Sequence, residues 1–344
     1  MTTARPDTVD LGRRGLLGMA AAATAAAEFG VLGAAPARAQ PAPTDSFGPP
    51  RQIDAGPLSI GYVDMGPPSG APVVLLHGWP YDIHAYAEVA PILARAGHRV
   101  IVPYLRGFGS TVFRSPETMR NAQQAAMAQD VANLMDALKI PRAILGGYDW
   151  GGRAADGVAT LWPERCAGLV SVSGNLVFAR QTAPAAGSPQ AAYTGWYLYY
   201  FASESGRLGY ERNRHDFNRM IWGQFSPKWR FDDAAYERTA QAFANADHAA
   251  IVIHSYRWRQ GLAEGEARYD PLEQKLAASR AITVPAITLQ GDADGGPHGA
   301  PEGYRARFTG PYAHRPVTGG VGHNLPQEAP AAFADAVLAV AGMG

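Results

Sequence analysis

Residues 147–151 read Gly-Tyr-Asp-Trp-Gly and lie between a short apolar run, residues 143–147, and a segment of helical character, residues 151–161. This spacing matches the strand–turn–helix pattern Gly-x-Ser-x-Gly, with Asp149 in the place of the serine. The glycines suit a tight turn that holds the central residue in a strained backbone conformation. A carboxylate needs no base to become a nucleophile at neutral pH, so Asp149 is the candidate nucleophile. The alternative is an aspartate that only caps the following helix.

Short apolar runs alternate with helical segments on both sides of this turn. Apolar runs bounded by turn residues are typical of strands buried on both faces of a sheet. The alternation predicts an α/β fold, with a mostly parallel central sheet and helices on both faces. The predicted strands are residues 53–65 (a pair broken at 55–57), 72–76, 99–103, 143–147, 167–172, 284–290 and 314–318, and the predicted helices are residues 85–96, 120–138, 151–161, 271–279 and 327–341.

The alternation stops between residues 176 and 266. That segment is rich in aromatic residues and arginine, shows mostly helical spacing, and has no run typical of a buried strand. We therefore expect a core domain, residues 53–175 and 267–344, interrupted by a helical cap domain, residues 176–266.

The first 39 residues have the layout of an export signal. Arg13-Arg14 precede an alanine-rich stretch, and Ala37-Arg38-Ala39 place small residues where a signal peptidase cuts. The paired arginines resemble a twin-arginine signal, which exports folded proteins. A membrane anchor is the alternative, although Glu28 interrupts the apolar stretch. The sequence thus predicts a periplasmic or secreted protein, with a Pro-rich leader at 40–52 and no stable membrane association after cleavage.

The composition narrows the class of function. The chain has 30 Lys and Arg against 30 Asp and Glu, and this zero net charge argues against a nucleic-acid partner. Hydrophobic residues make up 47% of the chain and charged residues 17%, which argues against a disordered chain. The single cysteine, Cys166, excludes an internal disulfide and a multi-cysteine metal site, and we expect it to be a small buried residue.

A second motif, His77-Gly78-Trp79-Pro80, directly follows the predicted strand at 72–76. Because it stands upstream of the turn at 147–151, it suggests that backbone N–H groups of Trp79 and Trp150 together form an oxyanion hole. Such donors would stabilise the negative charge that develops on an ester oxygen during hydrolysis.

Two motifs near the C-terminus supply an acid and a histidine. Asp294 follows the predicted strand at 284–290, and His323 lies in Gly320-Val321-Gly322-His323-Asn324, after the last predicted strand. The order nucleophile, acid, histidine is that of a triad in which the acid orients the imidazole and the imidazole activates water. Asp292 is the alternative acid.

From about residue 53 to the C-terminus the chain resembles α/β-hydrolases of the epoxide hydrolase and haloalkane dehalogenase group. The resemblance rests on four motifs that occur in that group's order: residues 77–80, 106–109, 147–151 and the motif around His323. It implies an α/β-hydrolase fold with a helical cap, and hydrolysis through an ester on the aspartate, without metal or cofactor. The Asp-Trp pair excludes the serine esterases and lipases that share the fold.

Cap tyrosines distinguish the reactions of that group. Epoxide hydrolases use two phenols, neutral donors at pH 7, to stabilise the oxygen that leaves the carbon. By the resemblance of the segments around them, Tyr197 and Tyr256 are the candidates, and Tyr199 or Tyr200 could replace Tyr197. The alternative is that these aromatic residues only pack inside the cap.

A dehalogenase is the second candidate. A haloalkane dehalogenase needs N–H donors for its halide: Trp150 could be one, whereas Trp79 stands where such relatives carry Asn. Four cap tryptophans could supply another donor: Trp196, Trp222, Trp229 and Trp258. Haloacetate dehalogenases resemble the chain at Arg153, where they hold the substrate carboxylate, but they carry Arg in the place of Trp150. We expect Arg153 on the solvent face of its helix or packed against the cap.

The sequence therefore favours hydrolysis of an epoxide to a vicinal diol. Asp149 would attack a ring carbon while Tyr197 and Tyr256 stabilise the leaving oxygen, and His323 with Asp294 would then direct water onto the ester. The expected substrate is small and hydrophobic, with water as co-substrate and no cofactor or metal. A non-catalytic binding protein of the same fold is the remaining alternative, and it would be expected to lack part of the triad.

Overall fold

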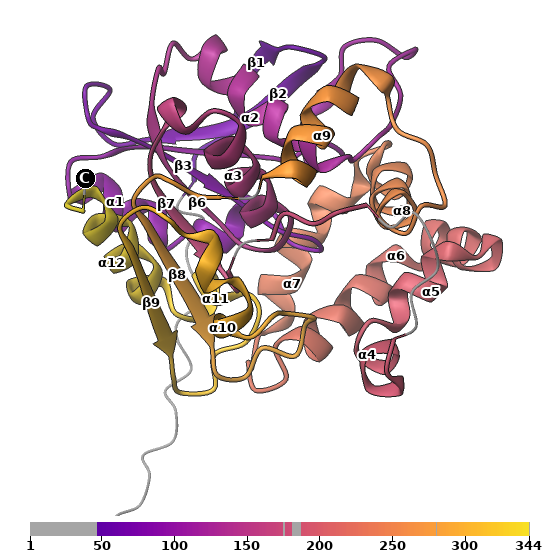
Figure 1. The fold of residues 1–344 in the computed structure, drawn as a ribbon. Helices are drawn as coiled ribbons and strands as arrows, with labels where there is room; N and C mark the ends of the chain where they lie inside the picture. Colours follow the sequence, from indigo (N-terminus) through magenta and orange to yellow (C-terminus); the bar gives the residue numbers. More distant parts are fainter. Residues whose placement is uncertain (1–46, 175, 181–186, 280, 344) are drawn as a thin grey trace, which may run out of the picture. The chain divides into compact units, whose positions relative to one another are not determined.

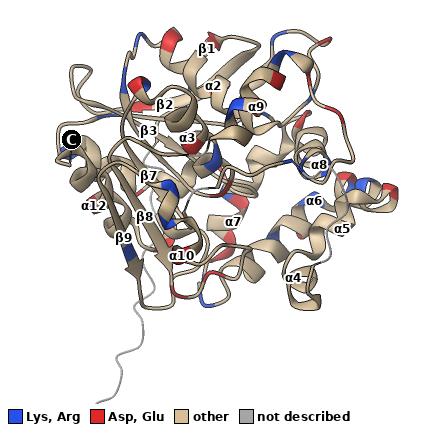
Figure 2. Cartoon of the chain, viewed as in Figure 1, with Lys and Arg blue, Asp and Glu red and all other residues tan. Residues whose placement is uncertain are grey.

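The computed structural model describes residues 47–174, 176–180, 187–279 and 281–343. The predicted export signal at 1–39 and the first part of the predicted leader lie outside the described residues. The described residues belong to one compact unit. None of their helices combines the length and apolarity needed to cross a membrane. Acidic and basic positions are scattered over the described ribbon without a stripe of one sign (Figure 2), which fits the balanced composition.

A nine-stranded sheet lies at the centre of the described part (Figure 1). Its strand order is β1-β2-β4-β3-β6-β7-β8-β9, with β5 paired to β2. From β4 to β9 along this order, neighbouring strands are parallel. β2 pairs antiparallel with β1, β4 and β5. The predicted α/β fold with a mostly parallel sheet is thereby confirmed. The strands are β1 (Arg51–Ala55), β2 (Leu58–Met65), β3 (Pro72–Leu76), β4 (Arg99–Pro103), β5 (Val112–Phe113), β6 (Ala143–Gly147), β7 (Cys166–Val172), β8 (Ala286–Gly291) and β9 (Tyr312–Val317).

Helices connect the strands and form the long insertion. The α-helices are α1 (Val89–Arg95), α2 (Gln124–Ala137), α3 (Asp149–Leu161), α4 (Pro189–Thr194), α5 (Trp196–Ala202), α6 (Glu204–Phe225), α7 (Asp233–Ala240), α8 (His248–Arg259), α9 (Asp270–Ala278), α10 (Pro301–Tyr304), α11 (Leu325–Glu328) and α12 (Pro330–Ala341). Short 3₁₀ helices are η1 (Ile83–Tyr86), η2 (Pro163–Arg165), η3 (Gln241–Ala244), η4 (Ala267–Tyr269) and η5 (Arg305–Arg307).

Helices cover both faces of the sheet. Successive residues of a strand point to opposite faces. In β6, a side chain on Gly146 would meet Phe333 of α12, whereas one on Gly147 would meet Gly151 of α3. α12 and α3 therefore lie on opposite faces. α1 packs on α12, and α2 and α9 pack on α3, which completes two helical layers around the sheet.

The strand order reverses at β3. The chain passes from β3 to β4 on one side and then returns to β6 on the other side of β3. Loops that leave the carboxyl ends of β3 and β6 thus diverge, and such a switch point is the usual ligand crevice of a parallel sheet. The motif at 77–80 leaves β3 and Asp149 follows β6, so both predicted motifs meet at this crevice.

Helices α4 to α8 form the insertion between β7 and β8, and they lie together to the right of the sheet in Figure 1. α5 packs against α6 and α8. Hydrogen bonds tie the insertion to loops of the sheet. The indole N–H of Trp222 donates to the Pro80 carbonyl at 2.7 Å. The amide of Asn245 donates to the carbonyls of Gly109 and Thr111 at 2.9 and 2.7 Å. That the insertion is a separate cap domain stays a prediction.

The predicted helix at 85–96 is wrong in its first turn. The structure has η1 in place of that turn, and α1 begins only at Val89. Pro91 explains the difference, because it lacks a backbone N–H and is tolerated only in the first turn of a helix.

The helix predicted at 120–138 is α2 in the structure, and it begins at Gln124, four residues later than predicted. The N–H of Ala122 donates to the His254 imidazole at 3.0 Å, so a partner from α8 holds this backbone in place of the helix. β1 begins at Arg51, two residues earlier than predicted. The short elements β5 and α10 are not among the predicted ones.

Candidate active site

The turn after β6 presents Asp149 in a strained backbone conformation. Asp149 has φ +49°, the left-handed region that side chains other than glycine seldom adopt. A Cβ on Gly147 would lie 2.5 Å from the carbonyl of Gly151, and a Cβ on Gly151 would overlap the carbonyl oxygen of Leu76. A Cβ on Gly78 would approach the Asp149 Cβ to 2.6 Å. The glycines therefore allow the carboxylate to lie directly against the end of β3.

The two oxygens of the Asp149 carboxylate have different neighbours. Oδ1 accepts the backbone N–H of Trp79 at 2.7 Å, whereas Oδ2 lies 3.8 Å from the His323 Nε2. Burial alone would raise the pKa of Asp149, but the contact with His323 holds it below its ordinary value. The carboxylate is thus ionised at neutral pH and can act as a nucleophile. The Trp150 amide lies at the open N-terminal end of α3 and makes no hydrogen bond to this carboxylate in the described structure.

His323 contacts Asp294 on its other side. Its Nδ1 lies 3.0 and 3.1 Å from the two carboxylate oxygens of Asp294. Asp294 is 1% exposed in its side chain, and it also accepts the Gly296 N–H at 2.8 Å and the Ser173 hydroxyl at 3.1 Å. These donors fix the carboxylate, which in turn orients the imidazole.

Asp292, the alternative acid, has a different position. It accepts the backbone N–H groups of Gly319, Gly320 and Val321 at 2.8 to 3.1 Å. It therefore stabilises the loop that leads to His323, and the carboxylate in contact with the imidazole is that of Asp294.

The protonation of His323 depends on both carboxylates. Burial lowers its pKa, but Asp294 and Asp149 together raise the pKa to about 10. Its Nε2 has no hydrogen-bond partner among the described residues. The Nε2 of the imidazole therefore faces the candidate nucleophile, 3.8 Å from its Oδ2.

A cavity of about 320 Å³ opens over Asp149 and His323, and Tyr197 and Tyr256 line it from the insertion. Both tyrosines are buried, and their ring centroids are 5.3 Å apart. The Trp79 ring packs against both, at 5.6 and 5.2 Å. Burial raises the pKa of each phenol well above 10, so both are neutral donors at physiological pH.

The alternative tyrosines lie elsewhere. The Tyr199 side chain is exposed, with 59% of its surface accessible. Tyr200 packs against Trp196 and Phe217, and neither Tyr199 nor Tyr200 is among the residues that line the cavity.

Of the two expectations for Arg153, the solvent-facing one is wrong. Arg153 is 7% exposed and lines the cavity, with its guanidinium 4.9 Å from the centre of the Phe178 ring. Sequence reasoning also missed Phe178 and Arg259, which line the same cavity. Arg259 follows Tyr256 by three residues on α8, and this helical spacing places both on one face, a signal that could have found it.

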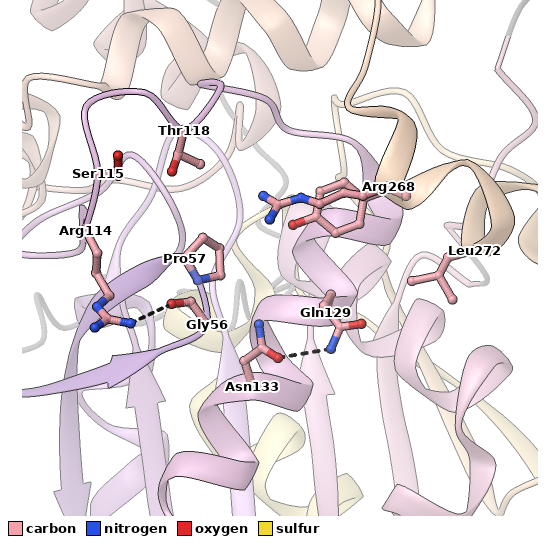
Figure 3. A pocket seen from close by; sticks show the side chains of 10 residues that line it. Gly56, Pro57, Arg114, Ser115, Thr118, Gln129, Asn133, Arg268 and Leu272 are labelled. Carbon is pink, nitrogen blue, oxygen red and sulfur yellow. Dashed lines mark hydrogen bonds between the residues drawn. The ribbon is translucent and has the colours of Figure 1, made fainter.

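A second hollow, of about 590 Å³, contains none of the predicted site residues (Figure 3). Its arginines have partners. Arg114 pairs with Asp54 at 3.2 Å and donates to the Gly56 carbonyl, and Arg268 pairs with Glu266 at 2.9 Å. Among the described residues, no three His, Cys, Asp or Glu side chains are grouped so that they could hold a metal ion.

The fold of this chain is similar to known structures. Residues 71–255, just over half of the chain, match a family model described as alpha/beta hydrolase fold. A crystal structure from Klebsiella pneumoniae, of a protein provisionally named an epoxide hydrolase, is 56% identical in sequence. The match covers 85% of this chain and 97% of that one, with a TM-score of 0.84.

Two curated relatives carry different names. A haloalkane dehalogenase of Mycobacterium marinum is 36% identical over 212 residues, which cover 60% of this chain and 68% of the relative. Epoxide hydrolase B of Mycobacterium tuberculosis is 35% identical over 152 residues, which cover 40% of this chain and 41% of the relative. The chain thus spans about two fifths of the length of that curated epoxide hydrolase.

Proposed function

This chain is a hydrolase that belongs to the α/β-hydrolase family, and we propose that it opens an epoxide to a vicinal diol through an ester on Asp149. One observation carries the proposal: two neutral phenols, of Tyr197 and Tyr256, line the same cavity as Asp149 and His323. Opening an epoxide places negative charge on its oxygen, and a pair of O–H donors stabilises that charge as it develops.

The first step forms the ester. Oδ2 of Asp149 attacks a ring carbon, the carbon–oxygen bond of the epoxide breaks, and the phenols of Tyr197 and Tyr256 donate to the leaving oxygen. Oδ1 remains on the Trp79 N–H, so the oxygen that becomes the ester carbonyl already lies on a backbone donor.

The second step hydrolyses the ester. His323, held by Asp294, takes a proton from water, and the water oxygen attacks the ester carbonyl carbon of Asp149. The N–H of Trp79 then stabilises the oxyanion, with the Trp150 amide at the start of α3 as the proposed second donor. Collapse of this intermediate breaks the bond between the carbonyl carbon and Oδ2, and His323 returns its proton to that leaving oxygen. The remaining proton of the water replaces the one given to the epoxide oxygen, so that the diol is released and the carboxylate, now carrying the water oxygen, is restored.

Dehalogenation on the same aspartate is the second candidate. It is favoured by the haloalkane dehalogenase among the relatives and by the Trp150 indole N–H, which has no partner among the described residues. A halide needs a further donor, however, and three candidate indoles already have acceptors. The indole N–H of Trp79 donates to the Tyr210 hydroxyl, that of Trp196 to the Gln224 side chain, and that of Trp222 to the Pro80 carbonyl. The indoles of Trp229 and Trp258 do not line the cavity.

The proposal is tested with the full chain and three substrates: styrene oxide, a bromoalkane and chloroacetate. We expect diol from styrene oxide, with kcat lowered about 10²-fold in Tyr197→Phe and in Tyr256→Phe, the loss typical of one transition-state donor. Tyr199→Phe removes an exposed phenol and is the matched control, with kcat unchanged. Halide release without diol, or full activity in both buried tyrosine variants, would overturn the proposal.

A further inference from the structure

Two guanidinium groups face the cavity from different elements. Arg153 comes from α3 and Arg259 from the last turn of α8, and their guanidinium carbons lie 4.9 and 4.8 Å from the centre of the Phe178 ring. Both groups thus contact the same ring and line the chamber that contains Asp149.

Neither arginine is neutralised by an ion pair within the described part of the chain. Arg153 is 93% buried, since only 7% of its surface is exposed, yet its single hydrogen bond runs from Nε to the Leu176 carbonyl at 3.4 Å. Its two terminal nitrogens have no partner among the described residues. Within the described residues, the guanidinium of Arg259 contacts the Phe178 ring and forms no hydrogen bond or ion pair. Both guanidinium groups therefore have donors left over at the cavity.

This arrangement is costly without a ligand. A buried charge is normally paired, and two like charges beside one another repel. Burial lowers the pKa of Arg153 and the charge of Arg259 lowers it further, whereas the charge of Asp149 raises it without reversing the decrease. Elsewhere the chain pairs a buried arginine fully: Arg106 donates to both carboxylate oxygens of Asp130, at 2.6 and 2.8 Å. The unpaired donors of Arg153 and Arg259 are thus a local exception at the candidate site.

We propose that Arg153 and Arg259 form a subsite for a carboxylate group of the substrate. This inference rests on the proposed function and narrows its substrate class to epoxides that carry a carboxylate. The planar guanidinium fork matches a carboxylate with two parallel hydrogen bonds, and the contact with the Phe178 ring restrains both groups. Because the subsite and Asp149 share a cavity of about 320 Å³, the acid group and the epoxide ring are only a few bonds apart. The expected hydrophobic character then applies to the rest of the substrate.

A matched pair of substrates tests the subsite in catalysis. 3-Phenyloxirane-2-carboxylate and its carboxamide differ only in the group that Arg153 and Arg259 would bind. We expect the native chain to prefer the acid at least about tenfold in kcat/KM, since charge-assisted bidentate pairs are the strong ones. In Arg259→Gln the KM for the acid should rise by about that factor, and the preference for the acid over the amide should fall with it.

Arg114→Gln is the control for charge alone. It removes one positive charge from a half-exposed side chain in the second hollow, so the preference for the acid should persist (Figure 3). Equal turnover of acid and amide by the native chain would overturn the subsite and leave the proposed function intact.

Binding of an unreactive acid tests the subsite without catalysis. Titration calorimetry with phenylacetate and phenylacetamide should show tighter binding of the acid to the native chain, and a smaller difference between the two compounds in Arg259→Gln. If both compounds bind alike to the native chain, the subsite is disproved whatever the activity. If the acid binds through Arg259 but no diol forms and chloroacetate releases chloride, the subsite stands and the proposed epoxide reaction fails.

Discussion

At the scale of single residues, His323 lies between two carboxylates whose charges change during the proposed reaction. Although burial lowers its pKa, Asp294 and Asp149 raise it to about 10 in the free enzyme. An ester on Asp149 carries no charge, so its formation removes part of that increase and the pKa of His323 falls. Ester hydrolysis, which needs neutral His323, should therefore slow as the pH is lowered. Ester formation should continue in acid, because the pKa of Asp149 is lowered.

The expected result is an ester that accumulates at low pH. Rapid quenching followed by intact-protein mass measurement at about pH 5 and about pH 8 should show more enzyme carrying the added epoxide mass at the lower pH. His323→Gln should accumulate the ester at both pH values, and Asp149→Ala at neither. A larger ester fraction at the higher pH in the native chain would contradict this assignment of the base.

Residues of the candidate site differ in how far the sequence could predict them. The glycines around Asp149 are required by close backbone contacts within the turn, so the local pattern 147–151 carries the geometry. Arg259 and Phe178 lie in different segments of the insertion, and only the folded chain brings them to Arg153. No short sequence motif indicates such a long-range contact.

At the scale of elements, α3 carries a buried carboxylate that opposes folding when it ionises. Asp156 is fully buried; its Oδ2 accepts the Leu176 N–H at 2.6 Å, and its Oδ1 has no partner among the described residues. Burial raises the pKa of Asp156 to about 7. The folded state therefore binds this proton more tightly than the unfolded chain, and stability is lost as the pH rises from about 4 to 7 and then stays constant.

Asp156→Asn should remove this loss. We expect its Tm to exceed that of the native chain at about pH 8, by several degrees, and the difference to disappear near pH 4. Asp136→Asn on α2 is the matched control, because that side chain is 64% exposed and pairs with Arg165, so no rise in Tm is expected. An unchanged or lower Tm for Asp156→Asn at the higher pH would disprove the assigned cost.

The ends of helices and strands differ from the prediction where a long-range contact, and not the local sequence pattern, determines them. Every predicted strand corresponds to a strand of the sheet, because apolar runs between turn residues are local signals. The start of α2 is set instead by the His254 side chain of α8, which binds the backbone at Ala122. The helical spacing of apolar residues from position 120 onward gives no indication of this contact with α8.

At the scale of the whole molecule, the insertion and the sheet share buried contacts at the site itself. The carbonyl of Phe225, at the end of α6, accepts the N–H groups of Gly295 and His323 at 2.9 and 3.2 Å. Trp222 in the same helix donates to the Pro80 carbonyl of the β3 loop. The helical insertion predicted from composition thus contacts the loops that carry the candidate triad, a detail that sequence periodicity could not give.

These links predict that the insertion and the sheet unfold in one transition. Urea titration followed by pulsed hydrogen exchange should give the same midpoint for peptides of α5 to α8 and for peptides of the strands β3, β6 and β7. Trp222→Phe removes the indole bond between the two parts and should cost about 1–3 kcal/mol. The loss should lower both midpoints together.

Trp196→Phe is the matched variant, because its indole bond to Gln224 at 2.7 Å stays within the insertion. In a coupled molecule this change must also lower the midpoint of the strand peptides, since the sheet cannot remain folded while the insertion opens. If insertion peptides exchange at a lower urea concentration than strand peptides, or if Trp196→Phe shifts only the insertion, the insertion is an independent domain. The contacts through Trp222 and Phe225 would then hold the candidate site together without coupling its two halves in stability.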